Sequence, residues 1–214
     1  ESRGSNNRAA LRSEEFIPTS ASIVDFEDFD TLATTRFDAF ISKLANGEDV
    51  RIAFMGDSFV EGDIVTCDLR EELQSRFGGR GAGFIPADIP FATVRKSIKR
   101  TSANWKTYSV MKPKEAPEAL RERLFVSGYL AEGRAGATTR WQATTSHASL
   151  DSCTQARILL ISRDTSRVEV VLGDTLRNEF MIAGDERVRE IYVEGPVDDI
   201  RLSVVEGSVM CYGA

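Results

Sequence analysis

Residues 50–62 read VRIAFMGDSFVEG, an apolar run that ends in a turn of small residues. The run over residues 50–55 is short and bounded by turn residues, which is typical of a buried strand in a parallel sheet. Gly56-Asp57-Ser58 follows it directly, and after Gly62 a helical pattern extends over residues 63–77. A strand, a sharp turn and a helix in this order predict the opening of an α/β layered domain.

The residues before this strand predict a helix and an N-terminal arm. Apolar side chains recur at three- and four-residue spacing as far as Leu44, with Asp30 or Thr31 available as the cap. Asn46-Gly47 would end the helix, because both residue types tolerate a left-handed conformation. The first twenty residues are polar and have no period, so we expect residues 1–25 to be an arm lying over the surface.

The residues after the second helix change character. The glycine-rich stretch over residues 78–83 ends that helix, and short runs at strand spacing follow, separated by turn residues. These runs cover residues 105–110, 124–130, 138–144, 156–162, 167–172, 178–182, 190–193 and 200–205. Many short strands with regular turns predict an antiparallel sandwich or jelly roll over residues 91–214.

Ser58 is the residue on which a chemical prediction can be based. A serine at the sharp exit of a buried strand holds its hydroxyl at the carboxyl end of the sheet, where ligands of open α/β sheets bind. Its backbone N–H would lie near the positive end of the next helix, where an oxyanion is stabilised. Gly56 permits the tight turn and Gly62 relieves crowding. The same tripeptide also serves as a plain turn with Asp57 as a helix cap, so alone it does not decide the function.

Residues 37–86 resemble block I of the SGNH (GDSL-type) hydrolase superfamily, whose signature Gly-Asp-Ser-x-x-x-Gly is matched by Gly56, Asp57, Ser58 and Gly62. The continuation over residues 68–86, DLREELQSRFGGRGAGFIP, is similar to bacterial cell-envelope and polysaccharide esterases. Several of those carry an inserted β-sandwich after block I. The resemblance implies a partial SGNH, flavodoxin-like three-layer α/β domain in residues 26–90. It also implies an all-β sandwich or jelly-roll module, like a carbohydrate-binding module, in residues 91–214.

The resemblance implies that Ser58 is the nucleophile and its N–H an oxyanion donor, in a secreted or periplasmic esterase without metal or organic cofactor. The substrate would be an ester-bearing carbohydrate or cell-envelope polymer. The family's Gly-x-Asn-Asp and Asp-x-x-His blocks have no counterpart here: His147, the only histidine, has Thr144 three residues before it. We therefore expect a C-terminal catalytic segment outside this sequence. The alternatives are a non-catalytic carbohydrate-binding or cell-surface module that keeps a relic turn, or a structural protein with neither activity.

Other polar and aromatic residues have plainer explanations. Glu61 and Asp63 are expected as first-turn carboxylates favoured by the helix dipole. The basic residues between Arg95 and Lys114 are expected in a solvated loop, with contact to an acidic polymer as the alternative. Four aromatic residues are expected in the core, with a sugar-stacking platform as the alternative: Trp105, Tyr108, Tyr129 and Trp141.

Composition narrows the classes of partner. The net charge of −6 disfavours nucleic acid and anionic membranes, which require clustered Lys and Arg. No apolar run approaches the roughly 20 residues that span a bilayer. The three cysteines are too few for a disulfide framework and too scattered for a zinc site. Their spacing leaves open whether Cys153 and Cys211 form a disulfide.

Overall fold

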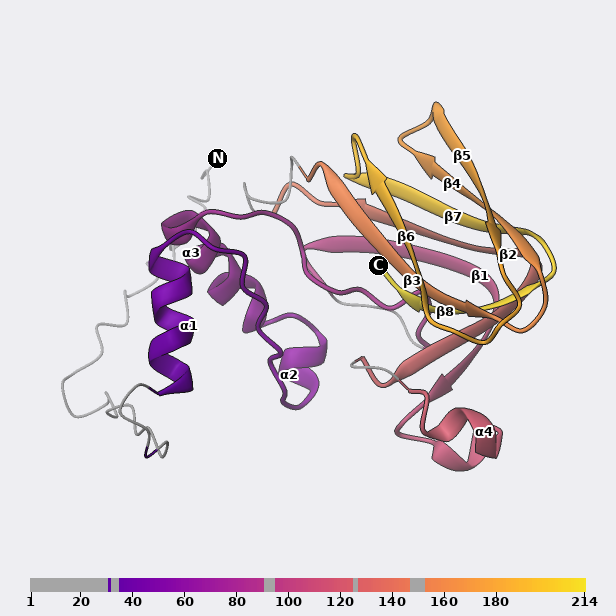
Figure 1. Ribbon diagram of the computed structural model, residues 1–214, viewed down its shortest axis with the longest axis horizontal. Helices are drawn as coiled ribbons and strands as arrows, with labels where there is room; N and C mark the ends of the chain where they lie inside the picture. The colour runs from indigo at the N-terminus through magenta and orange to yellow at the C-terminus, as the bar shows by residue number, and fades with distance from the viewer. Residues whose placement is uncertain (1–30, 32–34, 91–94, 125–126, 147–152) are drawn as a thin grey trace, which may run out of the picture.

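The computed structural model describes residue 31 and residues 35–90, 95–124, 127–146 and 153–214. Within these residues three helices precede the strands (Figure 1): α1 (Arg36–Ala45), α2 (Ser58–Glu61) and α3 (Thr66–Phe77). A long hairpin, β1 (Ile98–Ser109) and β2 (Tyr129–Ala143), encloses the 3-10 turn η2 (Pro113–Glu115) and α4 (Glu118–Arg121). The remaining strands are β3 (Gln155–Ser162), β4 (Ser166–Leu172), β5 (Leu176–Ile182), β6 (Arg189–Glu194), β7 (Asp199–Glu206) and β8 (Ser208–Gly213). The predicted arm over residues 1–25 lies outside the described residues.

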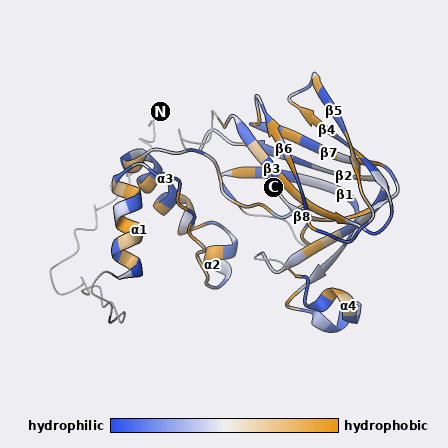
Figure 2. Cartoon of the chain, viewed as in Figure 1, coloured by the Kyte–Doolittle hydropathy of each residue, from blue (hydrophilic) through white to orange (hydrophobic). Residues whose placement is uncertain are grey.

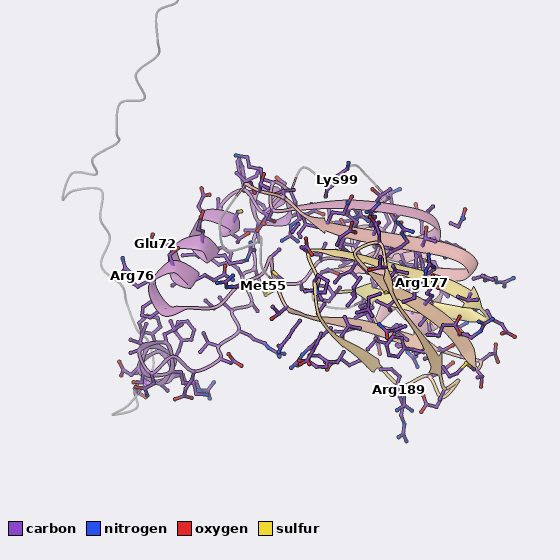
Figure 3. All side chains as sticks on the ribbon, turned by 90° about the horizontal axis from the view of Figure 1, so that it is seen from above. Met55, Glu72, Arg76, Lys99, Arg177 and Arg189 are labelled. Atoms are coloured by element: carbon purple, nitrogen blue, oxygen red, sulfur yellow. The ribbon has the colours of Figure 1, made fainter. Side chains whose placement is uncertain are left out.

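The expected three-layer α/β domain is wrong for the described residues. Residues 50–55 form no strand, and Met55 is 89% exposed (labelled in Figure 3). A buried parallel strand needs hydrogen-bonding neighbours and covering helices. In the described part of the chain, every strand belongs instead to an antiparallel sheet that begins at Ile98. Helices α1, α2 and α3 lie beside that sheet rather than on both of its faces (Figures 1 and 3).

The helices differ from the predicted ones at their beginnings. Thr35, rather than Asp30 or Thr31, caps α1: its hydroxyl accepts from the N–H of Asp38 at 3.0 Å, while the Asp38 carboxylate accepts from the N–H of Thr35 at 3.1 Å. This reciprocal capping box satisfies two N–H groups that the helix leaves unpaired. The helix predicted over residues 63–77 begins only at Thr66, because Asp63 has a φ of +59° and cannot belong to a right-handed helix. None of the described helices is long and apolar enough to cross a membrane.

Strand β2 organises the sheet, which has the order β5-β4-β7-β2-β8-β3-β6, with β1 also paired to β2. Residues 138–142 of β2 pair with β7, whereas residues 131–134 pair with β8. Between these two stretches the register with β1 shifts, Asn104 has a φ of +62°, and its side-chain amide donates to the Gly136 carbonyl at 2.9 Å. The sheet therefore folds over along β2 and nearly closes into a sandwich-like barrel.

The core lies between the two halves of this folded sheet. Apolar and polar residues alternate along strands such as β4 and β7 (Figure 2), so one side of these strands is buried and the other is more exposed. The predicted short runs correctly gave the places of β3, β4, β5, β6 and β7. Three strands were predicted less well: β1 begins at Ile98 rather than 105, β2 is one strand where two were predicted over residues 124–130 and 138–144, and β8 was missed. The fully buried core residues include Ile158, Leu160, Val168, Val170, Leu172 and Leu202.

The last residues of the chain hold the segment that follows α3 against the sheet. The N–H of Ile85 donates to the Ala214 carbonyl at 2.7 Å, and the N–H of Ala214 donates back to the Ile85 carbonyl at 2.9 Å. Gly213, the residue before Ala214, forms an antiparallel β-bridge with Pro86. A Cβ at Gly213, where φ is +146°, would lie 2.0 Å from the Ile85 carbonyl oxygen. This backbone contact therefore requires glycine.

We predict that Gly213→Ala destabilises the protein more than Gly173→Ala does. Gly173 also has a positive φ, of +58°, but a Cβ there meets nothing within 4 Å, so its substitution costs only backbone strain of about 1–2 kcal/mol. Gly213→Ala adds a clash with backbone, and crowding of this kind costs about 1–3 kcal/mol more. Urea denaturation measures the difference. Equal free energies of unfolding for the two variants would show that residues 85–87 do not depend on this contact.

Candidate functional site

Ser58 is exposed at the first position of the one-turn helix α2. The Asp57 side chain caps this turn by accepting from the N–H of Phe59 at 3.0 Å, and the N–H of Gly62 closes it on the Ser58 carbonyl at 2.9 Å. A Cβ at Gly56 would lie 2.5 Å from a methyl group of Val60, so the approach to the turn is crowded. The four residues of the signature thus build one compact turn.

The helix after Ser58 is shorter than the sequence predicts, and this changes the electrostatics. A single turn carries little of a helix macrodipole, and the longer helix α3 begins only at Thr66. The Ser58 N–H is one of the N–H groups that a helix start leaves without an intrahelical partner. The turn can therefore offer an oxyanion a local hydrogen-bond donor, but not the field of a long helix.

Glu61 connects this turn to the sheet. The Tyr129 hydroxyl, at the start of β2, donates to the Glu61 carboxylate at 2.5 Å. Burial and this hydrogen bond raise the pKa of Tyr129 to about 12, so the hydroxyl stays protonated and keeps donating at neutral pH. Glu61 is the last residue of the one-turn helix α2 rather than a carboxylate at the start of the predicted helix over residues 63–77, and its carboxylate is engaged by a residue 68 positions away.

Asp63 is not the solvated first-turn carboxylate that the sequence predicts. Its side chain is buried, and it accepts from the Thr66 hydroxyl at 2.6 Å, from Arg70 at 2.7 Å and from the Ser97 hydroxyl at 2.6 Å. The Arg95 guanidinium lies 3.2 Å away. Burial opposes ionisation, but the hydrogen bond from Arg70 and the charge of Arg95 outweigh it, so the pKa of Asp63 lies well below its ordinary value. We call these five residues the Asp63 cluster.

The Asp63 cluster joins the Ser58 turn to the beginning of the sheet. Arg95 also donates to the carbonyls of Ala82 and Phe84, both at 3.1 Å, and so reaches the loop after α3. Burial lowers the pKa of Arg95 against the opposing effect of Asp63, which fits an ion pair held away from water. The buried Asp63 carboxylate therefore contacts α3, through Thr66 and Arg70, and the segment just before β1, through Arg95 and Ser97.

The basic residues between Arg95 and Lys114 do not form one solvated loop. Arg95 belongs to the Asp63 cluster, and Arg100 is buried against Asp88 at 3.3 Å. Asp88 also accepts from the hydroxyls of Ser102 and Thr107. No periodicity signals these two ion pairs, because Asp63 lies 32 positions from Arg95 and Asp88 lies 12 positions from Arg100.

The aromatic residues belong to the core, as predicted. Tyr108, Tyr129 and Trp141 are buried, and Trp105 packs partly buried against the core with its indole N–H donating to the Thr138 carbonyl at 2.8 Å. These four side chains therefore offer no flat exposed platform for a sugar ring. No disulfide joins Cys153 to Cys211 in the described residues, and Cys67 is buried.

The hydroxyl of Ser58 has no hydrogen-bonded base within the described residues. His147, the only histidine of the sequence, lies outside them. A serine hydroxyl is a weak nucleophile until a base accepts its proton. The turn thus presents an exposed serine hydroxyl and a backbone N–H, and no base for the hydroxyl is found among the described residues.

No family model matches this sequence, and no curated protein matches it. Among solved structures, a peptidoglycan O-acetylesterase matches with a TM-score of 0.52 and 19% identity, over 82% of this chain and 47% of that protein. The chain thus spans about half the length of that esterase. TmCBM61 in complex with β-1,4-galactotriose matches with a TM-score of 0.32 and 7% identity, over 55% of this chain and 85% of the other. At that TM-score it carries no weight. The first match shows a shared fold.

We predict that Asp63→Asn lowers the free energy of unfolding by about 3–5 kcal/mol, because it leaves buried arginines without their counter-charge. The asparagine tolerates the positive φ, so the effect reports the lost charge. The folded pKa of Asp63 lies below its unfolded value of about 3.9. The stabilisation is therefore fully present above that pH and is lost as the pH falls below it. Urea denaturation at pH 7 and pH 3 measures both effects.

The matched control is Glu72→Gln, which breaks the exposed pair between Glu72 and Arg76 on α3 (both labelled in Figure 3). An exposed pair of this kind contributes less than about 1 kcal/mol. If Asp63→Asn costs no more than Glu72→Gln at pH 7, the Asp63 cluster does not hold the two parts of the chain together.

Proposed function

We propose that this chain is the nucleophile-bearing part of a serine esterase that removes acyl groups from a carbohydrate or cell-envelope polymer. The observation that carries the proposal is Ser58, exposed in the compact Gly56–Gly62 turn of a chain that shares the fold of part of a peptidoglycan O-acetylesterase. Residues 26–90 would contribute to the hydrolase domain and residues 91–214 would be its β module. A substrate of this kind places the enzyme outside the cytoplasm, secreted or periplasmic.

The reaction would proceed by acyl transfer through Ser58. The Ser58 hydroxyl oxygen forms a bond to the ester carbonyl carbon while its proton passes to a base, and the Ser58 N–H donates to the developing oxyanion. The sugar oxygen then leaves with a proton, and the acyl group remains on Ser58. Water hydrolyses this acyl-enzyme, which releases a carboxylic acid and restores the hydroxyl.

The base and the remaining oxyanion donors would come from a further catalytic segment that carries the family's Gly-x-Asn-Asp and Asp-x-x-His blocks. The apolar surface around the turn supports this part of the proposal. Ile52, Phe54, Met55, Phe59 and Ile64 are exposed large hydrophobic side chains, all within seven residues of Ser58. Contiguous exposed apolar surface marks a place where another segment packs. A segment that packs on these side chains would bury them and could bring a base beside Ser58.

The second candidate is a non-catalytic carbohydrate-binding or cell-surface module with a relic turn. One observation favours it: no base contacts the Ser58 hydroxyl within the described residues. The two candidates differ in whether the complete protein hydrolyses any ester.

We expect the chain extended to the stop codon of its gene to hydrolyse p-nitrophenyl acetate and O-acetylated peptidoglycan, and the 214-residue chain to be inert. Ser58→Ala in the extended protein removes the nucleophile, so kcat falls by about 10³-fold or more. Ser75→Ala, an exposed serine on α3, is the matched control and leaves the rate unchanged. Release of acetate, followed over time, measures all four proteins.

Equal rates for the Ser58→Ala and unsubstituted extended proteins would remove Ser58 from the chemistry. An extended protein that is folded but inert on every ester tested would favour the non-catalytic module.

A further inference from the structure

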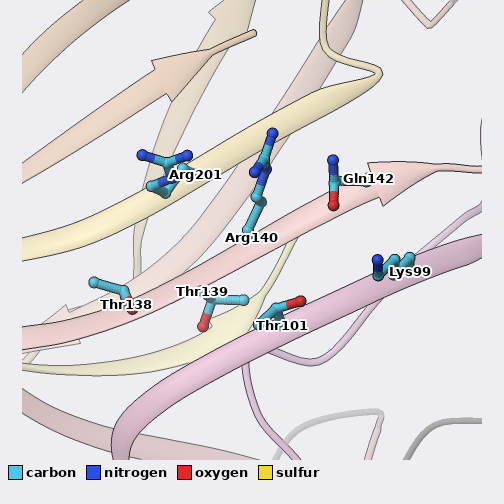
Figure 4. A pocket seen from close by; sticks show the side chains of 7 residues that line it. All are labelled: Lys99, Thr101, Thr138, Thr139, Arg140, Gln142 and Arg201. Carbon is cyan, nitrogen blue, oxygen red and sulfur yellow. The ribbon is translucent and has the colours of Figure 1, made fainter. Parts of the chain in front are cut away.

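A shallow hollow of about 360 Å³ lies on the outer face of the sheet (Figure 4). Its volume lies at the lower end of the range of small-molecule sites. Strands β1, β2 and β7 form its floor. The residues that line it are Lys99, Thr101, Thr138, Thr139, Arg140, Gln142 and Arg201.

The register of the three strands places these side chains together. Thr101 pairs with Arg140, and Arg140 pairs with Arg201, so these three residues form one row across the sheet. Lys99 pairs with Gln142 in the neighbouring row. Because side chains alternate between the two faces of a strand, the intervening residues point into the core, among them Ile98, Trp141, Ile200 and Leu202. The packing of these core residues therefore fixes which polar side chains point outward into the hollow.

The hollow carries more positive than negative charge. Arg140 is held by Asp199 through two hydrogen bonds, one of them 2.7 Å long, and Gln142 donates to the same carboxylate at 3.2 Å. Lys99 and Arg201 form no ion pair with any carboxylate among the described residues. The Asp174 charge also acts on Arg140, and the Arg201 charge acts on Asp199 without a direct ion pair. Lys99 and Arg201 are therefore the two cations of the hollow that can still form a direct ion pair with a ligand.

This chemistry suits a carboxylate that is attached to a sugar. Lysine and arginine bind carboxylates through charge-assisted hydrogen bonds, and threonine hydroxyls and a glutamine amide can pair with sugar hydroxyls. None of the lining residues is aromatic, so stacking on a neutral sugar ring is not available there. We propose that this hollow binds a carboxylate-bearing sugar of an acidic polysaccharide, through Lys99 and Arg201. That the ligand is a glycan rests on the proposed function; that it is an anion rests on the hollow itself.

The net charge of the whole chain makes this proposal more specific. At −6 the protein does not attract a polyanion as a whole, so binding must come from the local pair of cations. The Debye length is about 8 Å at physiological ionic strength, so salt weakens exposed charge pairs of this kind. Affinity should therefore depend on both side chains and fall as salt is added.

The test measures binding of polygalacturonate to the 214-residue chain by isothermal titration calorimetry. The fully methyl-esterified polymer is the matched ligand, because it has the same backbone without the charge. We expect the acidic polymer to bind and the ester not to bind. The double variant Lys99→Gln/Arg201→Gln should lose at least tenfold in affinity. The double variant Arg76→Gln/Lys114→Gln, which makes the same change of charge on α3 and η2, should change it less than twofold.

Four results would overturn the proposal: no binding of the acidic polymer, equal binding of the methyl ester, unchanged affinity of the Lys99→Gln/Arg201→Gln variant, or equally tight binding of polyglutamate, which would make the ligand an acidic peptide. Circular dichroism of both double variants confirms that they are folded. Because binding is measured without hydrolysis, a chain that binds the acidic polymer but has no esterase activity in its extended form would refute only the proposed function. Active esterase without binding would refute only the hollow.

Discussion

The buried carboxylate of Asp63 is the interaction on which the arrangement of the helices and the sheet depends. It accepts hydrogen bonds from α3 and from the residue before β1, and two arginines balance its charge. A buried, ionised carboxylate such as that of Asp63 is stabilised by these partners, and losing them would leave an uncompensated buried charge. Its left-handed backbone also interrupts the helix after Ser58. The same residue therefore separates the Ser58 turn from α3 and connects that turn to the segment before β1.

The sheet provides the second constraint, since β2 takes part in both of its halves. Because β2 pairs with β7 along one stretch and with β8 along another, the core is closed without a separate second sheet. Tyr129, at the beginning of this strand, reaches Glu61 in α2, and Thr139 donates to the Ala87 carbonyl. One strand thus carries contacts to the helical part and, on its outward face, Arg140 and Gln142 of the charged hollow. A distortion of β2 would therefore shift both its contacts to the helical part and the side chains of the charged hollow.

The sequence predicts most strands correctly because a short apolar or alternating run between turn residues is local information: residues 200–205, for example, show which face is buried without reference to their partners. It fails where the outcome depends on distant residues. The run over residues 50–55 is as apolar as a buried strand, but burial requires pairing partners that the described residues do not supply. Strand β8 was not predicted because nearly all of its residues are buried, so its sequence does not alternate between apolar and polar residues. Arg95 and Arg100 look like surface residues until Asp63 and Asp88 are brought beside them.

The same distinction separates what the Ser58 turn contains from what an esterase needs. A turn is specified mainly by residues close in sequence, and here the Asp57 cap and the backbone hydrogen bonds of the turn all close within seven residues. A general base must approach the hydroxyl from another part of the chain, because no neighbour in the turn can both cap the helix and accept the serine proton. Asp57 is already committed to the Phe59 N–H, and Glu61 to Tyr129. The two carboxylates nearest in sequence are thereby engaged elsewhere, which leaves the position beside the Ser58 hydroxyl open to a histidine.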